Sequence, residues 1–412
     1  MRVIEKLSDD GSVVGGPPLI ANPIYRLLQK RLAIRNRYGI KFQTKNSVHH
    51  SFAWPSTGLG QELNQMACDI IHLHWVGHME GHDTLSVREI GMLSKPVVWT
   101  LHDQWPFCGA EHYVSPPPQV DDRFIAGYLD SNRPIGETGK DRNQAVWMSK
   151  LKYWKTPFNI VCPSRWMAEC AAASRLMARW PVTVIPYPID LERWAPLEQG
   201  LARQVLNLPM DRQIILLCAD GGARDPRKGA HLLAEALQKV DEWHTEIADS
   251  CLLLILGQEE NPTFKTTIPT RFAGRLTSDL ELRLHYAAAD VVVIPSIQDN
   301  LPLVGIEAHA CGTPVVGFNI GGLPDIISHE YTGALAEPLD PASLAKALIW
   351  VLQDKDRHHE LSTNARNKAE DLWSPGVVSK QYCKLYEQII PDKQLSGTQE
   401  DLPHSKGGII GS

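Results

Sequence analysis

The sequence of 412 residues is poor in the features that mark several classes of protein. None of its eight cysteines forms a CxxC pair, so we expect reduced, packed thiols and no disulfide or zinc framework. The formal net charge of -6 gives no overall attraction to nucleic acid or to anionic lipid. Any basic site must therefore be local.

The sequence also lacks a segment typical of membrane insertion. No apolar run approaches the roughly 20 residues that span a bilayer. The opening stretch, MRVIEKLSDDG, has charges where a signal peptide has an apolar core. We therefore predict a cytoplasmic protein that binds no nucleic acid and that contacts a membrane, if at all, only peripherally at its inner face.

Apolar runs typical of buried strands alternate with helical segments through most of the sequence, as in βαβ units around parallel sheets. In the first half we expect strands at 68–76, 95–103, 158–164 and 181–189. In the second half we expect them at 213–220, 251–258, 270–274, 290–296 and 313–318. Two separate series predict an α/β protein with two doubly wound, Rossmann-like parallel-sheet domains facing a cleft.

The boundary between the two domains is expected in IPYPIDLERWAP, at 185–196, where three prolines interrupt regular structure. We predict one domain at 1–188, joined by a C-terminal crossover helix at about 375–390, and a second domain at 189–374. The polar tail at 391–412 is expected to be disordered. The segment 114–141 has no clear period and is interpreted as a long loop or insertion without an assigned fold.

The stretch PSIQDNLPLVGIEAHACGTPVV, at 295–316, follows an expected strand and carries two carboxylates. Asp299 lies in the predicted loop, and Glu307 lies just over one turn into a helix that begins at Pro302. Ligands bind at this edge of a parallel sheet, and the first helical amides, at Leu303 and Val304, form an anion site. The two acids could accept hydrogen bonds from sugar hydroxyls, or they could be a turn former and a solvated helix residue.

A second stretch, CADGGARDPRKGAHLLAEAL at 218–237, passes from a predicted strand through a glycine-rich basic loop into a helix. Arg224, Arg227 and Lys228 could surround a diphosphate there. The loop has neither the GxxxxGK[ST] spacing nor the GxGxxG fingerprint, and by itself it could be an ordinary solvated turn. In the same predicted sheet as the acidic stretch, it suggests the second wall of one anion pocket.

Together with the segment from Phe272 to Leu276, these motifs resemble glycosyltransferase family 4, whose members have the GT-B fold. The resemblance covers roughly residues 10 to 390 and is most specific at 290–325. Within the family, the sequence is similar to the branch that makes cell-surface polysaccharide or lipopolysaccharide. The resemblance implies a sugar donor with a nucleoside diphosphate, bound in the second domain, and transfer with retention of configuration. It further implies a glycan or lipid-linked acceptor in the first domain and no metal or other cofactor.

The resemblance also assigns roles on the donor side. Asp299 and Glu307 take the places of the family's two acids, which contact the donor sugar and the ribose, although Asp299 is shorter than the usual glutamate. Lys228 takes the place of the diphosphate lysine. The arginine expected five residues earlier is Ala223 here, so Arg224 or Arg227 is the substitute.

Further donor-site residues come from two other segments. Arg275, in the segment that resembles the family's FxGRL motif, is assigned to donor binding. Gly15 and Gly16 follow a short expected strand, where they would let the backbone approach a donor phosphate. The alternative for the glycine pair is a flexible entry loop.

On the acceptor side, His102 and Asp103 end an expected strand, and the resemblance places them beside the anomeric carbon. A histidine there could donate to a sugar hydroxyl or change charge near neutral pH, or it could be a structural histidine capped by Asp103. His74 shares i,i+4 spacing with His78 and His82, which suggests a metal site. The glycines between them weaken a helix, so we expect His74 to line the acceptor side instead.

The segment 142–158 mixes lysines with Trp147 and Trp154 in a helical pattern. It could rest on anionic lipid and present a lipid-linked acceptor, or it could be an ordinary packed helix with its tryptophans in the core. The sequence leaves both interpretations open.

The function predicted from these observations is retaining transfer of a hexose, with His102, Asp299 and Lys228 as catalytic residues. Lys228 and the amides of Leu303 and Val304 would stabilise the charge of the leaving nucleoside diphosphate. The alternatives are a sugar-nucleotide epimerase or synthase with the same architecture, and a noncatalytic protein that binds nucleotide sugars. The lack of GxGxxG argues against a nicotinamide oxidoreductase.

Overall fold

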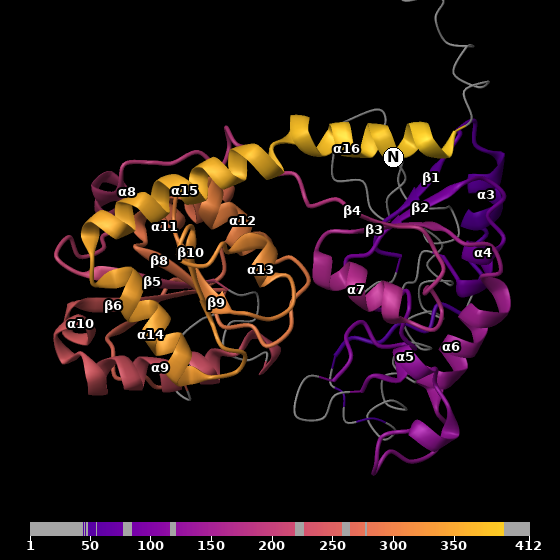
Figure 1. Cartoon of the computed structure of the whole chain (residues 1–412), viewed down its shortest axis with the longest axis horizontal. Coiled ribbons are helices and arrows are strands. Elements are labelled where there is room, and N and C mark those ends of the chain that lie inside the picture. The colour runs from indigo at the N-terminus through magenta and orange to yellow at the C-terminus, as the bar shows by residue number, and fades with distance from the viewer. Residues whose placement is uncertain are drawn as a thin grey trace, which may run out of the picture.

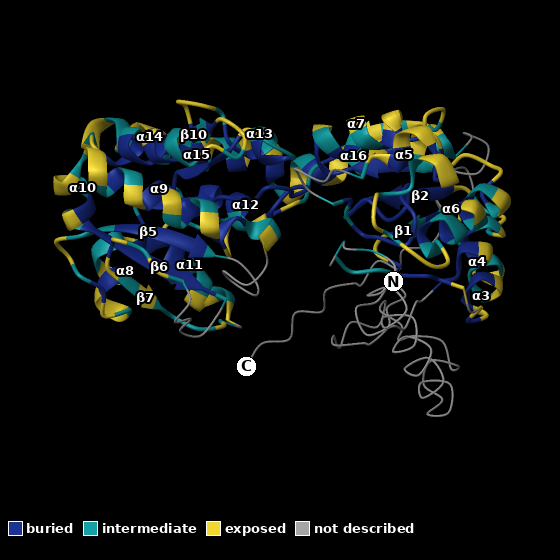
Figure 2. Cartoon of the chain, turned by 90° about the horizontal axis from the view of Figure 1, so that it is seen from below, coloured by how far each residue is buried: buried dark blue, intermediate teal, exposed yellow. Residues whose placement is uncertain are grey.

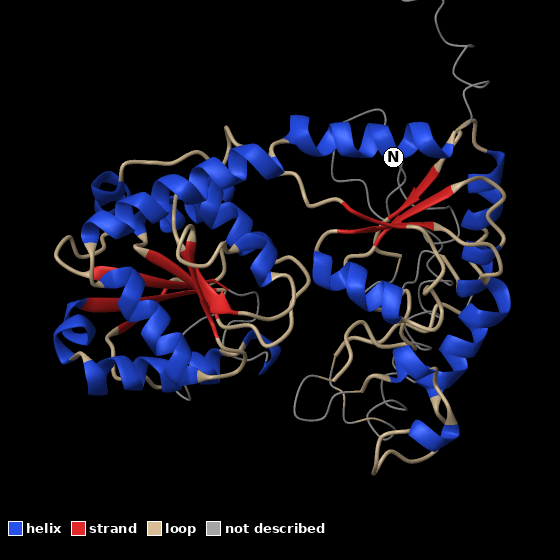
Figure 3. Ribbon diagram, viewed as in Figure 1, coloured by secondary structure: helices blue, strands red, loops and turns tan. Residues whose placement is uncertain are grey.

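The computed structural model describes residues 44, 46, 48–54, 56–76, 85–115, 121–218, 226–257, 264–276 and 278–390. Gly15, Gly16, Arg224 and the tail at 391–412 lie outside these residues. The described part of the chain forms two separate parallel sheets, each flanked by helices (Figures 1 and 3). The prediction of two α/β domains with parallel sheets is therefore confirmed.

The first sheet has the strand order β1-β2-β3-β4. Its strands are β1 (Ile71–Leu73), β2 (Val97–Thr100), β3 (Asn159–Cys162) and β4 (Val182–Val184). The helices around it are α3 (Leu59–Gln65), α4 (Val87–Gly91), α5 (Arg123–Ala126), η1 (a 3-10 helix, Asp130–Asn132), α6 (Arg142–Tyr153) and α7 (Arg165–Ala173). α4 begins with a capping box in which Ser86 and Glu89 satisfy each other's backbone amides.

The second sheet has the order β10-β9-β8-β5-β6-β7. Its strands are β5 (Gln213–Cys218), β6 (Cys251–Leu256), β7 (Thr270–Phe272), β8 (Val291–Ile294), β9 (Val315–Phe318) and β10 (Gly333–Ala336). The helices around it are α8 (Gln199–Val205), η3 (Pro226–Lys228), α9 (Ala230–Trp243), α10 (Thr245–Ser250), α11 (Asp279–Ala288), α12 (Leu303–Ala310), α13 (Leu323–Ile326), α14 (Pro341–Leu352) and α15 (Lys355–Trp373). The last helix, α16 (Pro375–Ile389), returns to the first sheet. β10 was not among the expected strands.

The central strands of the second sheet are uninterrupted apolar runs because both faces of the sheet are covered. One apolar core packs on each face, so that alternate residues of β5, such as Ile214 and Ile215, belong to different cores. Figure 2 shows this as buried strands between layers of partly exposed helices. Such a sheet leaves its carboxyl edge as the place for a ligand.

The chain crosses between the two domains twice, and the crossings lie side by side. Ile185 belongs to the first domain's core and Ile189 to the second, and the Ile189 amide donates to the Trp373 carbonyl at 2.8 Å. After Trp373 the chain returns as α16, whose Val378 and Leu385 pack on the first sheet (Figure 1). In the part of the chain that the structure describes, no helix combines the length and the apolar character needed to cross a bilayer.

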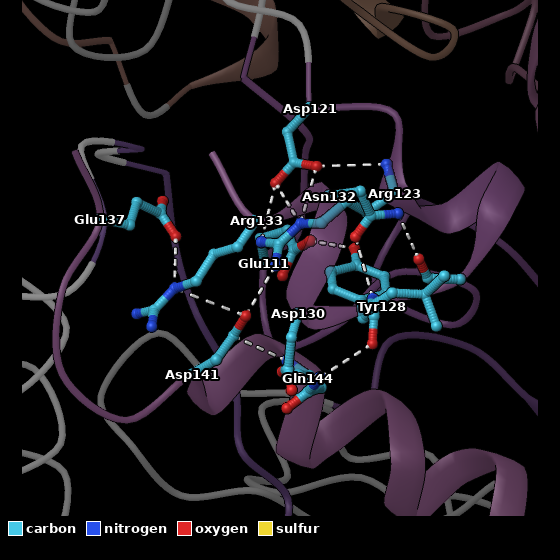
Figure 4. Close-up of polar contacts among 12 residues, drawn as sticks. Glu111, Asp121, Arg123, Tyr128, Asp130, Asn132, Arg133, Glu137, Asp141 and Gln144 are labelled. Carbon is cyan, nitrogen blue, oxygen red and sulfur yellow. Dashed lines mark hydrogen bonds and ion pairs between the residues drawn. The ribbon is translucent and has the colours of Figure 1, made fainter. Parts of the chain in front are cut away.

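The described part of the segment 114–141, which we predicted as a loop or insertion without an assigned fold, is organised around a buried guanidinium (Figure 4). Arg123 lies between Asp121 and Asp141, at 2.9 and 2.7 Å, and its side chain is 1% exposed. The Tyr128 hydroxyl donates to the Glu111 carboxylate. Ion pairs and hydrogen bonds hold α5 and η1 in place. This explains why this part of the sequence shows no clear helical or strand periodicity of apolar residues.

α6 is a packed helix, which decides between the two interpretations of its tryptophans. Trp147 and Trp154 are both buried in the first core and leave no aromatic face for a membrane. Lys150, also on α6, is fully buried, and its ammonium group donates to the carbonyls of Trp105, Cys108 and Gly109. These bonds fix the loop that follows His102 and Asp103.

Candidate functional site

Two loops of the second domain meet at the carboxyl edge of the sheet, since β5 and β8 are neighbours. The Ile297 amide donates to the Arg227 carbonyl at 2.9 Å, which joins the loop after β8 to the loop before α9. Gly229 adopts a φ of 69°, and a Cβ there would lie 1.8 Å from the Pro295 carbonyl oxygen. Only glycine permits this approach.

The approach of the two loops brings Lys228 and Asp299 into contact. The Lys228 ammonium lies 2.6 Å from Oδ2 of Asp299, and the Ser296 hydroxyl donates to the same oxygen at 3.3 Å. Both charged side chains are largely but not wholly buried, with exposures of 22% and 11%. The lysine ammonium donates only to Asp299 among the residues that the structure describes, so two of its three N–H donors have no acceptor there.

Glu307 lies on α12, close to α11. The Tyr286 hydroxyl donates to Oε2 of Glu307 at 2.7 Å. Burial raises the pKa of Glu307, and the bond from Tyr286 opposes that rise. Additional hydroxyl donors would stabilise the charged form of this carboxylate, because each hydrogen bond to it opposes the effect of burial.

The N-terminus of α12, which follows the loop that carries Asp299, offers backbone hydrogen-bond donors. α12 begins at Leu303, one residue later than predicted, with Pro302 as its N-cap and no side chain that caps it. Among the described residues, the amides of Leu303 and Val304 donate to no acceptor. They leave the positive end of the helix dipole open to an anion.

The two remaining described arginines of the predicted donor site are placed differently. The Arg227 guanidinium lies 4.6 Å from the centre of the Tyr113 ring and donates to the Gln298 carbonyl at 3.2 Å. It therefore links the two domains. Arg275 is exposed after β7.

On the first domain's side, His102 lies just past the end of β2 and is held at both ring nitrogens. Nδ1 is 2.8 Å from the Tyr187 hydroxyl, and Nε2 is 3.0 Å from Nδ1 of His74. Burial and the neighbouring His74 lower the pKa of His102 to about 4, and burial also lowers that of His74. His102 is therefore neutral at pH 7, so it can donate or accept a hydrogen bond there without a change of charge.

The Asp103 carboxylate is hydrogen-bonded to His112 and to the Trp105 amide. Its Oδ2 accepts from Nδ1 of His112 at 2.6 Å, and its Oδ1 accepts from the Trp105 amide at 2.9 Å. Its pKa is lowered because the His112 ring and the Trp105 amide outweigh the cost of burial. Asp103 thus supports the loop after β2, and it does not cap His102. His112, nine positions away, was not among the predicted site residues.

The donor-side loop of the second domain and the loop after β2 of the first domain are in contact at Asn300, the residue after Asp299. The side-chain nitrogen Nδ2 of Asn300 donates to the His102 carbonyl at 3.1 Å, so the loop that carries Asp299 and the loop that carries His102 are in direct contact. The structure therefore brings Lys228, Asp299 and the start of α12 together and sets them against the His102 loop. Within the described ranges no group of three or more His, Cys, Asp or Glu side chains could hold a metal ion. His78 and His82 lie outside those ranges.

Two family models match the chain, one for each domain. The model described as Glycosyltransferase Family 4 matches residues 19–193, and that described as Glycosyl transferases group 1 matches 199–368. The chain is 27% identical over 347 residues to a D-inositol 3-phosphate glycosyltransferase of Geodermatophilus obscurus, which covers 78% of this chain and 71% of that enzyme. Matches to three further enzymes of that name span about half of their length, 47% to 51%.

Solved structures show the same fold at low sequence identity. Sucrose-phosphate synthase from Thermosynechococcus elongatus superimposes with a TM-score of 0.59 at 21% identity, covering 80% of this chain and 76% of that one. The Anabaena protein Alr3699/HepE, solved in complex with UDP and glucose, gives 0.56 at 17% identity, covering 81% and 83%. These structures show the GT-B fold of two parallel-sheet domains, and the two family models, which together span 19–193 and 199–368, identify the chain as a glycosyltransferase of the family 4 and group 1 type.

Proposed function

We propose that this protein transfers a hexose from a nucleoside-diphosphate sugar to an acceptor hydroxyl with retention of anomeric configuration. The observation that carries the proposal is the Lys228–Asp299 ion pair at the carboxyl edge of β5 and β8. The Lys228 cation and the open helix amides suit the diphosphate of such a donor, and the carboxylates of Asp299 and Glu307 suit hydroxyls of its sugar and its ribose.

In this proposal the donor diphosphate binds Lys228 and the amides of Leu303 and Val304, while Asp299 and Glu307 accept hydrogen bonds from sugar and ribose hydroxyls. In the reaction the bond between the anomeric carbon and the phosphate oxygen breaks, and a bond to the acceptor oxygen forms on the same face. The acceptor proton passes to the leaving diphosphate, so no covalent nucleophile is required. Lys228 and the helix amides stabilise the negative charge that develops on the leaving group.

In this proposal Nδ1 of the neutral His102 keeps its contact with the Tyr187 hydroxyl, while Nε2 exchanges its contact with His74 for the donor sugar and donates a hydrogen bond to a sugar hydroxyl. The low pKa of His102 supports this role over that of a charged acid near pH 7. The contact between the two domains at Asn300 would help to exclude water, which would otherwise hydrolyse the donor. No step in this scheme uses a metal ion.

The identities of donor and acceptor are also proposals. The complex of Alr3699/HepE with UDP and glucose supports UDP-sugars as the first donors to test. We propose a glycan or lipid-linked acceptor in polysaccharide or lipopolysaccharide biosynthesis, because the 290–325 segment resembles that of family 4 glycosyltransferases. The name of the Geodermatophilus relative adds a phosphorylated cyclitol as a second acceptor class. A lipid-linked acceptor would bring the protein to the inner face of the cytoplasmic membrane.

The test is a thermal-shift panel of UDP-, GDP- and ADP-sugars, followed by product analysis with glycan, lipid-linked and cyclitol phosphate acceptors. A donor that binds only the folded state at 100 times its Kd adds about 2.7 kcal/mol to stability, which raises Tm measurably. NMR of the product reports the anomeric configuration. A sugar nucleotide changed without an acceptor would indicate the epimerase or synthase alternative. Binding without turnover would indicate a noncatalytic protein, and an inverted product would reject the proposed mechanism.

A further inference from the structure

The side chain of Asn300 connects the two domains through three hydrogen bonds. Nδ2 donates to the carbonyls of Leu101 and His102 at 3.0 and 3.1 Å. Oδ1 accepts from the Ser164 hydroxyl at 2.8 Å. Asn300 is 2% exposed, so these bonds lie in a buried part of the interface. Both amide hydrogens are used, and the partners are all on the first domain.

The orientation of this amide is determined by its surroundings. Ser164 is the N-cap of α7, and its hydroxyl oxygen accepts from the Met167 amide at 3.1 Å. The hydroxyl proton is therefore available for Oδ1 of Asn300, while two carbonyls require the NH₂ group on the other side. A flipped amide would set oxygen against two oxygens. The cap of α7 thus fixes which way Asn300 points.

The loop that carries Asn300 is also in contact with the loop before α13, on the second domain. The Gly322 amide donates to the Asp299 carbonyl at 3.0 Å. A Cβ on Gly322 would lie 1.5 Å from the Asn300 carbonyl oxygen and 3.0 Å from Cβ of Ser164. The backbone of Asp299 and Asn300 is therefore clamped between this loop and the first domain.

Two other polar contacts between the domains are weaker or more exposed. Arg165 pairs with Asp325 at 2.5 Å, but its side chain is 74% exposed, and exposed pairs contribute little. Gln298 and Gln104 are 3.4 Å apart, at the long end of the hydrogen-bond range. Among these contacts, Asn300 alone bonds to the backbone that carries His102.

We propose that Asn300 is a positioning residue that sets the His102 loop at a fixed separation from the Lys228–Asp299 pair. Asn300 follows Asp299 directly and bonds to the carbonyl of His102 itself. Groups on opposite domains can act on one sugar only while their separation is maintained. Loss of the amide leaves the donor-side groups intact and separates them from the histidine. The kinetic part of this proposal rests on the proposed function.

The expected kinetic effect is a loss of turnover with little change in donor affinity. A displacement of about 1 Å between reacting groups can lower a rate about 100-fold. Asn300→Ala removes all three hydrogen bonds, and we expect kcat to fall by about 30- to 100-fold with donor Kd within about 3-fold of wild type. Ser164→Ala leaves the two carbonyl contacts in place, so we expect a smaller loss, about 2- to 10-fold, of the size of one neutral hydrogen bond.

The experiment compares Asn300→Ala, Asn300→Asp and Ser164→Ala with the matched control Arg165→Ala, which removes the exposed interdomain pair. Asn300→Asp keeps the shape but sets a carboxylate against two carbonyls, so its kcat should fall at least as far as that of Asn300→Ala. Arg165→Ala should behave as wild type. Circular dichroism identifies any variant that fails to fold, and Ser164→Ala provides the milder substitution in that case.

A second measurement needs no turnover. Hydrogen–deuterium exchange should rise in the peptides that cover 101–105 and 297–302 in both Asn300 variants, and not in Arg165→Ala. Unchanged exchange in these peptides, or wild-type kcat in folded Asn300→Ala, would overturn the proposal. So would a loss that appears only in donor Kd. If wild type transfers sugar from no donor, the proposed function fails, while the exchange data still decide whether Asn300 ties the two loops together.

Discussion

Replacing Lys228 by alanine separates two contributions of this side chain. Lys228→Ala removes an ion pair at 2.6 Å from Asp299 and, in the proposed reaction, the main side-chain cation at the leaving group. Because the pair is largely buried, its loss should cost more than the roughly 0.2–1 kcal/mol of an exposed pair and less than the roughly 3–5 kcal/mol of a fully buried one, so we expect the free energy of unfolding to fall by about 1–3 kcal/mol. Loss of one preorganised donor to a developing anion costs about 2.7–4 kcal/mol, or about 100- to 1,000-fold in kcat.

The assay is steady-state transfer from the donor identified by thermal shift, together with urea denaturation of each variant. A double-mutant cycle with Asp299→Asn distinguishes the two roles. If Lys228 serves only to hold Asp299, the double variant loses no more than the worse single variant. If Lys228 acts on the leaving group, its loss adds to that of Asp299→Asn. A Lys228→Ala enzyme with activity within a few-fold of wild type would refute the assignment.

Three further predictions concern other parts of the chain. Because burial raises the pKa of Glu307 and ribose hydroxyls would favour its charged form, donor affinity measured by calorimetry should fall as the pH is lowered from neutrality and Glu307 becomes protonated. Glu307→Gln should weaken binding and remove that dependence, and an identical pH profile in the variant would contradict the ribose assignment. Tyr187→Phe deletes one hydrogen bond to His102 and should lower kcat about 2- to 10-fold without changing donor Kd; an effect on Kd alone would argue against it. Arg123→Met leaves Asp121 without its cation and Asp141 with only the more distant Arg133, and it should cost about 3–5 kcal/mol in urea denaturation, whereas a midpoint equal to wild type would show that the network is not needed.

The sequence alone determined the two-sheet architecture, because parallel strands covered on both faces must be apolar throughout. Each expected strand from 68–76 to 313–318 corresponds to a strand of the structure. β10 was missed because GALA, at Gly333–Ala336, is short and made of small residues that carry little strand signal. The sequence also determined that Asp299 and Lys228 would lie near a carboxyl edge of the second sheet, since each follows an apolar strand.

Only the tertiary structure decided which side chains meet at that edge. Lys228 and Asp299 are 71 positions apart, His102 and Tyr187 are 85 apart, and Asn300 and the His102 carbonyl are 198 apart. Hydrogen bonds between such distant residues depend on how loops from different strands are placed, and periodicity carries no information about that. The same reason explains Asp103, which the sequence paired with its neighbour His102 and the fold pairs with His112. Local pattern fixed the strands, and the packing of the two domains fixed the partners.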